Sequence, residues 1–274
     1  MGLRPKNVFL KSKNDEPKKI RLIHKEALTH DVRLFRWEFE NDLHFGLLPG
    51  EHIKLISEVN GVKMSRFYSP VSDPNQFGSF EIVVKVYNPS TDHPNVGVFS
   101  TYLDSLPLNS ELLVSGPFGG IAYLNEGDFL MKQTNVRQFK TIAMIAGGSG
   151  LTPMVQLMRH VMREDGANAP KLNLIYTNKT EEDVILADEL KAYSSMNPTK
   201  FSLTLAFTRL FDGIAEDSRR SWKQHVGRID EGLLAKVFPF PTDDVLVLIC
   251  GPRAMNVHAK NLCTSLGYTH ISIF

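Results

Sequence analysis

The sequence predicts two domains: an antiparallel β-barrel followed by an α/β domain with a five-stranded parallel sheet. In the first half, short β-type runs alternate with turn residues, and no long helix lies between them. In the second half, continuous apolar runs alternate with helix-like stretches, which is typical of a parallel sheet covered on both faces. The chain has 274 residues, of which 42% are hydrophobic, so it can bury two cores.

The chain begins with a basic segment. Eight Lys and Arg residues but only two acidic residues occur within residues 1–25. We expect residues 1–17 to form a solvated tail or linker; the alternative is an arm for an acidic partner or an anionic lipid surface. The barrel domain is expected at 18–125, an interdomain linker at 126–140 and the α/β domain at 141–274.

Six strands are expected in the barrel domain. Turn pairs such as Pro49-Gly50 and Asn60-Gly61 separate them. Residues 99–106 have the apolar spacing of a short amphipathic helix. The expected strands are 19–23, 32–39, 52–59, 64–69, 80–87 and 111–115.

Four apolar runs are the clearest strands of the α/β domain. Between the first two, Met154, Leu157, Met158 and Val161 recur at helical spacing, as expected of a helix that covers a sheet. The four runs are 141–146, 172–177, 201–207 and 245–249.

Charge and cysteine content exclude several classes of protein. The 31 basic and 30 acidic residues give a net charge of +1, so no basic excess predicts nucleic-acid binding. The longest apolar run, 245–250, is far shorter than the roughly 18–20 residues that cross a membrane. Two cysteines, Cys250 and Cys263, are too few for a disulfide framework, a four-thiolate cluster or a structural zinc site. We expect a cytoplasmic monomer without a bound metal, attached to a membrane only through a separate anchor or a partner.

Two motifs in the barrel domain could bind a cofactor. Arg66-Phe67-Tyr68-Ser69 closes a strand and offers a cation, a ring and a hydroxyl. Gly97-Val98-Phe99-Ser100 opens the expected short helix, where free backbone N–H groups favour a pyrophosphate. Taken singly, each also fits an ordinary sheet or an ordinary capped helix.

Two further motifs follow strands of the α/β domain. Gly147-Gly148-Ser149-Gly150, continuing through Thr152 and Pro153, lies where the first strand turns into its helix. It lacks the third glycine of the dinucleotide fingerprint, yet it still permits close approach of a pyrophosphate. Cys250-Gly251-Pro252 follows the run 245–249, at the sheet edge where ligands bind. The alternative for Cys250 is a buried core thiol.

Together and in this order, the four motifs resemble those of the ferredoxin-NADP reductase superfamily. Within it, the sequence is similar to the NADH-cytochrome b5 reductases and to the flavin domain of nitrate reductase. The resemblance runs from about residue 18 to the end, and includes 82–87, 178–183 and the terminal Phe274.

The resemblance implies FAD in the first domain. Arg66 would neutralise its pyrophosphate, Tyr68 would pack along the flavin, and Ser69 would hydrogen-bond near flavin N5. Because the cofactor supplies the redox chemistry, no general base is needed. Further flavin contacts are expected from Phe67, Val83, Lys85, Gly97, Val98, Phe99, Ser100 and Thr152.

The resemblance also implies NADH or NADPH in the second domain and a haem acceptor such as cytochrome b5. The dinucleotide would lie across the glycine motif, with Cys250, Gly251 and Pro252 positioning its nicotinamide. One alternative is a reductase module of a larger enzyme such as nitrate reductase. The other is a flavin-binding scaffold or sensor without turnover, although such a protein would not need Ser69 and Cys250.

Three departures from the family pattern stand out. First, Val96 occupies the position of a second glycine and Val98-Phe99 replace a Lys-Met pair; second, Arg253 replaces a proline. Third, Thr208-Arg209 follow the run 201–207, where relatives that favour NADH carry an acidic residue. A hydroxyl and a guanidinium there, with Arg219 and Arg220 further on, predict that NADPH is accepted at least as well as NADH.

Overall fold

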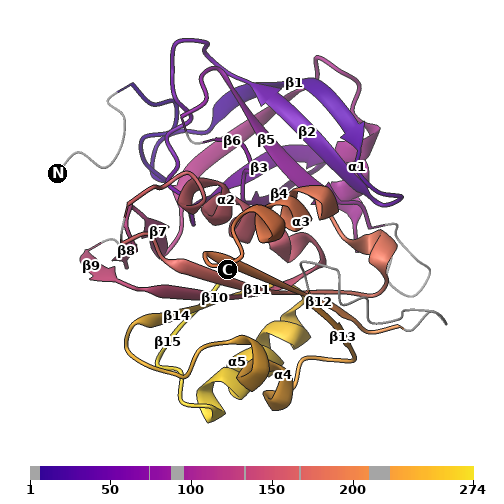
Figure 1. Ribbon diagram of the computed structural model, residues 1–274. Helices are drawn as coiled ribbons and strands as arrows, with labels where there is room; N and C mark the ends of the chain where they lie inside the picture. The colour runs from indigo at the N-terminus through magenta and orange to yellow at the C-terminus, as the bar shows by residue number, and fades with distance from the viewer. Residues whose placement is uncertain (1–6, 74, 88–95, 133, 167, 210–222) are drawn as a thin grey trace. The chain divides into compact units, whose positions relative to one another are not determined.

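The structure is a computed structural model with two compact units, Met1–Ala122 and Tyr123–Phe274. Each unit has its own core. The ribbon is shown in Figure 1. The residues described are 7–73, 75–87, 96–132, 134–166, 168–209 and 223–274.

A six-stranded antiparallel sheet forms the first unit, in the order β4-β3-β6-β1-β2-β5. The sheet curls around an apolar core that includes Trp37. Its two edge strands, β4 and β5, are linked by a hydrogen bond: the N–H of Val71, just after β4, donates to the carbonyl of Glu81 on β5 at 2.8 Å. All six expected strands are present, which confirms the barrel-like fold. They are β1 (Lys18–Ala27), β2 (Val32–Glu38), β3 (His52–Val59), β4 (Val62–Tyr68), β5 (Ser79–Lys85) and β6 (Glu111–Phe118), and the short helix is α1 (Val98–Ser105).

The expectation that residues 1–17 are a solvated tail is wrong for 8–10. Phe9 is 2% exposed, and its ring stacks on Phe39 at 4.6 Å between centroids. Its N–H donates to the carbonyl of His44 at 2.7 Å. Three adjacent apolar residues in a basic segment are enough to join the core of the first unit, because their backbone also finds partners.

The stretch expected to be a linker also contains regular structure. Strands β8 (Asp128–Met131) and β9 (Asn135–Gln138) form an antiparallel hairpin, and β7 (Ile121–Tyr123) completes a three-stranded sheet. Buried aromatic rings explain why this stretch is regular rather than a linker: the ring of Phe129 packs edge to face on that of Phe139, with 5.8 Å between the ring centres.

The second unit contains a six-stranded parallel sheet in the order β13-β12-β11-β10-β14-β15. This confirms the α/β fold, although the expected five strands are six. The edge strands β13 and β15 are four residues long and partly polar, so they lack the apolar signal of the central strands. The strands are β10 (Thr141–Gly147), β11 (Lys171–Asn178), β12 (Phe201–Phe207), β13 (Lys223–Val226), β14 (Val245–Cys250) and β15 (His270–Ile273).

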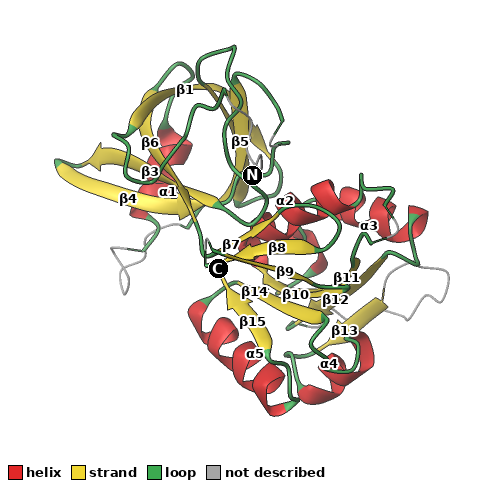
Figure 2. Ribbon diagram, turned by 90° about the vertical axis from the view of Figure 1, so that its left-hand side faces the viewer, coloured by secondary structure: helices red, strands yellow, loops and turns green. Residues whose placement is uncertain are grey.

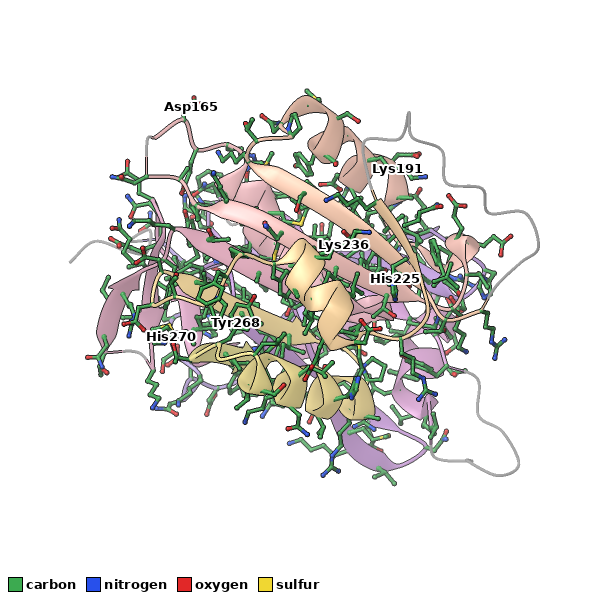
Figure 3. All side chains as sticks on the ribbon, turned by 60° about the horizontal axis from the view of Figure 1, so that its bottom comes forward. Asp165, Lys191, His225, Lys236, Tyr268 and His270 are labelled. Carbon is green, nitrogen blue, oxygen red and sulfur yellow. The ribbon has the colours of Figure 1, made fainter. Side chains whose placement is uncertain are left out.

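Helices cover both faces of this sheet (Figures 1 and 2). Two short 3₁₀ turns, η1 (Gly148–Leu151) and η2 (Glu181–Asp183), follow β10 and β11. In Figure 3, Lys236 marks α4, and Tyr268 precedes β15, where its hydroxyl donates to the carbonyl of Pro239 at 2.6 Å. The helices are α2 (Thr152–Val161) and α3 (Ala187–Met196) on one face, and α4 (Glu231–Val237) and α5 (Arg253–Ser265) on the other.

The strand order places a switch point between β10 and β14. From β10 the chain adds β11 and β12 on one side, then returns to place β14 on the other side. Ligands of open α/β sheets bind at the carboxyl ends of such neighbouring strands. No helix in the described ranges is both long and apolar enough to cross a bilayer.

Candidate functional site

In the first unit, the expected flavin-binding motif lies on the edge strand β4. Arg66 and Tyr68 share one face of this strand because they are two residues apart. Tyr68 packs against the core, whereas Arg66 is exposed and donates to the carbonyl of Ser65 at 2.8 Å. Burial raises the pKa of Tyr68, and the Arg66 guanidinium opposes this shift. Tyr68 is therefore neutral at physiological pH and offers a ring and a hydroxyl, with Ser69 directly after it.

Two expected flavin contacts lie on β5. The side chains of Ile82 and Val84 point into the core of the first unit, so Val83, between them on the strand, points away from it. Val83 is nevertheless only 3% exposed. Lys85 shares the face of Val83, and its ammonium lies 2.8 Å from the carboxylate of Asp31. The Lys85 cation thus has an internal counter-ion, which orients its side chain.

The expected phosphate-binding turn begins α1. Gly97 has φ 81°, and a Cβ there would overlap the carbonyl of Tyr87, so only glycine fits. The Ser100 hydroxyl donates to the carbonyl of Gly97 at 2.9 Å and accepts from the N–H of Tyr87 at 3.1 Å. Ser100 therefore joins the turn to the segment that follows β5. An anion at this turn would be bound mainly by the backbone N–H groups of Val98 and Phe99, since no side chain caps the helix.

In the second unit, the structure brings the two remaining motifs together at the switch point. Ala146 on β10 is the register partner of Cys250 on β14. A Cβ at Gly150 would overlap the carbonyl of Cys250, and one at Gly147 would come within 2.6 Å of Met255 Sδ. Gly148 has open space on its Cβ side. The glycines thus let one loop lie against the Cys250-Gly251-Pro252 turn and leave its other side open, as a dinucleotide pyrophosphate requires.

Two side-chain hydrogen bonds hold the glycine loop in place. The Tyr176 hydroxyl, on β11, donates to the carbonyl of Gly148 at 3.0 Å. The Thr152 hydroxyl donates to the carbonyl of Ser149 at 3.2 Å, which orients this side chain within its own loop. Tyr176 and Met255 were not expected at the site, because an apolar strand and an amphipathic helix do not show which side chains reach a neighbouring loop.

Cys250 is a neutral thiol. Burial raises its pKa to about 11. A thiol that is protonated at neutral pH is a poor nucleophile and a poor metal ligand. Its place at the end of β14 therefore suits packing against a flat ring rather than covalent chemistry.

At the other end of the same sheet edge, β12 is followed by Thr208 and Arg209, both exposed. The N–H of Thr208 donates to the carbonyl of Asn178 at 3.1 Å, and the N–H of Arg209 donates to that of Lys179 at 3.0 Å. The two loops after β11 and β12 are thereby joined, and neither Thr208 nor Arg209 contributes an acidic group. Arg219 and Arg220 lie outside the described residues.

The expected site residues thus form two groups, one in each unit. The glycine loop, Thr152 and 250–252 gather at the switch point, whereas Thr208 and Arg209 lie further along the same edge. The first-unit residues come from β4, β5 and the start of α1.

Comparison with known proteins gives two domain families. Residues 19–123 match an oxidoreductase FAD-binding domain, and residues 144–261 match an oxidoreductase NAD-binding domain. The chain is 35% identical over 283 residues to NADH-cytochrome b5 reductase 2 of Danio rerio, which covers 99% of this chain and 88% of that protein.

Nitrate reductases are also similar. The chain is 36% identical to nitrate reductase [NADH] 1 of Zea mays over 86% of this chain, but it spans only 37% of the maize enzyme. Among solved structures, the cytochrome b5 reductase domain of Ulva prolifera nitrate reductase superposes with a TM-score of 0.87 at 28% identity. That match covers 97% of this chain and 100% of the Ulva domain.

Proposed function

The chain belongs to the NADH-cytochrome b5 reductase family of FAD- and NAD-binding oxidoreductases, and from this premise we propose that it passes electrons from NADH or NADPH to a haem protein such as cytochrome b5. The observation that carries the proposal is the approach of the glycine loop to Cys250 at the switch point of the parallel sheet. When bound, FAD would accept two electrons as a hydride and release them singly.

The chain's own residues would bind and orient the two cofactors. Arg66 and the first turn of α1 would neutralise the FAD pyrophosphate, while Tyr68 and Ser69 would contact the flavin. In the second unit, the backbone of the glycine loop would bind the dinucleotide. The neutral Cys250 would provide a small, uncharged surface against which the nicotinamide ring can pack.

We also propose a cytoplasmic location. Cys250 and Cys263 are both free. Free thiols are typical of a reducing compartment, which supports a cytoplasmic location. As an alternative, the chain would act as the reductase module of a larger enzyme and carry out the same electron transfer there. The match to the Ulva nitrate reductase domain supports this alternative.

Visible absorbance of the purified chain tests the proposal directly. With FAD present, we expect flavin bands that bleach within seconds when NADH is added without oxygen. Bands that persist with both NADH and NADPH would indicate a flavin-binding scaffold without turnover. A chain that binds no FAD at all would overturn the proposed roles of Arg66 to Ser69.

We further propose that NADPH is accepted at least as well as NADH. Thr208 and Arg209 are exposed at the sheet edge and offer a hydroxyl and a cation to a 2′-phosphate. In Thr208→Asp, the added carboxylate should repel that phosphate and lower kcat/KM for NADPH by about tenfold or more, with little loss for NADH. Steady-state kinetics with both nucleotides checks this. A strong NADH preference that the substitution leaves unchanged would refute it.

A further inference from the structure

Three aromatic rings form a cluster on the outer face of the first unit. Phe67 is 59% exposed, although it directly precedes Tyr68 and Ser69. Its ring meets His52 edge to face at 5.2 Å and Phe118 edge to face at 5.5 Å. More than half of the surface of Phe67 is open to solvent, yet the two edge-to-face contacts fix the orientation of its ring. An exposed ring that is held in place is suited to contact with another molecule.

Two polar side chains, Lys54 and Ser115, lie beside these rings. Lys54 and Phe67 are register partners on the neighbouring strands β3 and β4 (Figure 2). The Lys54 ammonium lies 5.2 Å from the centre of the Phe118 ring, and no ion pair joins it to a carboxylate in the described part of the chain. Ser115, the register partner of Lys54 on β6, is 5% exposed, and its hydroxyl has no hydrogen-bond partner. Burial lowers the pKa of His52, so its imidazole is neutral at physiological pH.

We propose that this aromatic–basic patch, made of His52, Lys54, Phe67, Ser115 and Phe118, is the surface on which the acceptor protein docks the edge of its haem. This inference rests on the proposed function, and it names the part of the chain that recognises the acceptor. A haem edge combines a flat apolar rim with two propionate carboxylates. The rim matches the exposed Phe67 ring, and a propionate matches the unpaired Lys54 cation.

The exposure of Phe67 favours a protein partner over a small molecule. Small ligands bind in concave pockets that bury most of their surface, whereas Phe67 stands open on a sheet face. Protein interfaces, in contrast, concentrate their binding energy in a few aromatic and cationic side chains. Phe67 directly precedes the proposed flavin contacts Tyr68 and Ser69 on β4 and lies on the opposite face of the strand from Tyr68.

Binding of ferric cytochrome b5 to the FAD-loaded chain tests the patch without turnover. Isothermal titration calorimetry at low salt should give a Kd about tenfold or more higher for Phe67→Ala. Lys54→Gln should also weaken binding and reduce its dependence on salt, because one charge pair is lost.

Two matched controls lie elsewhere in the same unit. Phe77 is 54% exposed, and its ring is tilted against that of His44 with 3.8 Å between the ring centres. The Lys18 ammonium lies 4.6 Å from the centre of the Phe9 ring. Phe77→Ala and Lys18→Gln should bind cytochrome b5 within about twofold of the unchanged chain. The proposal is overturned if Phe67→Ala and Lys54→Gln also bind within twofold, or if the control variants lose as much affinity.

Rapid mixing separates this inference from the proposed function. Reduction of the flavin by NADH should stay within about twofold in Lys54→Gln, while reoxidation by cytochrome b5 slows and reoxidation by a small uncharged oxidant such as benzoquinone does not. An equal loss with both oxidants would place the defect at the flavin and overturn the docking role. If NADH fails to reduce the unchanged chain, the proposed function fails, and the binding measurement alone then decides whether the patch binds cytochrome b5.

Discussion

At the scale of single residues, burial rather than charge sets the chemistry of Cys250. Its pKa of about 11 lies two units above the ordinary value of 9.0. Because thiolate content falls tenfold for each pH unit below the pKa, Cys250 should hold about a hundredfold less thiolate at pH 8 than an ordinary thiol. The neutral thiol favours the folded state below pH 9, and this contribution is lost as pH rises towards 11.

Alkylation by iodoacetamide, followed on the Cys250 peptide by mass spectrometry, checks this expectation. The rate should keep rising through pH 10 without levelling off. Cys250→Ala removes that peptide's signal and serves as the control. A rate that levels off near pH 9 would show that Cys250 has an ordinary thiol pKa and is open to solvent.

Gly150 is needed because of a single close approach. Any side chain there would overlap the carbonyl of Cys250, so the loop or the strand end has to move. We expect Gly150→Ala to raise KM for NADH by about tenfold or more, since small displacements at a binding loop have large effects. FAD content, measured by absorbance, should not change, because Gly150 lies in the second unit. Gly232→Ala, where the added Cβ meets only Asp230 Oδ1 at 3.5 Å, is the control and should leave KM unaltered.

At the scale of elements, the segment 8–10 acts as part of the first unit. Phe9 is 2% exposed and contacts Phe39 and Phe45. Phe9→Ala should therefore lower the free energy of unfolding of the first unit by about 3–5 kcal/mol, the usual cost of removing a buried ring. Unfolding in urea measures the change, with the loss of flavin fluorescence quenching as the signal. The exposed Phe77 is the comparison: if Phe77→Ala costs as much, the burial of Phe9 is not the cause.

Elements with a strong apolar period could be predicted from the sequence, and those without one could not. The strand β3 and the strand β12 were predicted at the bounds that the structure shows. The edge strands β13 and β15 and the hairpin β8-β9 were missed because they are four residues long and mostly half-exposed or exposed, so neither alternation nor a continuous apolar run marks them.

The candidate site shows the same limit for a different reason. Motif positions after strands placed the glycine loop and Cys250 at one sheet edge, because parallel strands end at the same side. The hydrogen bond from Tyr176 to Gly148 and the ion pair of Lys85 with Asp31 each join residues that are close in space but distant in the sequence. Patterns within one segment carry no information on such contacts.

At the scale of the whole molecule, the two cofactors are assigned to units with separate cores. Leu55 belongs to the core of the first unit and Leu234 to that of the second, and both are fully buried. Each cofactor should therefore stabilise chiefly the unit that binds it, by an amount set by its concentration relative to its Kd. Hydrogen exchange of the loaded chain is suited to resolve the two effects.

Leu55→Ala and Leu234→Ala form a matched pair for this test. Each removes the same side chain from a fully buried position, at an expected cost of about 2–5 kcal/mol. Leu55→Ala should speed amide exchange in the first unit and weaken FAD binding, while Leu234→Ala should speed exchange in the second unit and weaken protection by NAD⁺. If either substitution instead accelerates exchange equally in both units, the chain unfolds as one cooperative body, and the stabilities of the FAD and nucleotide sites cannot be separated.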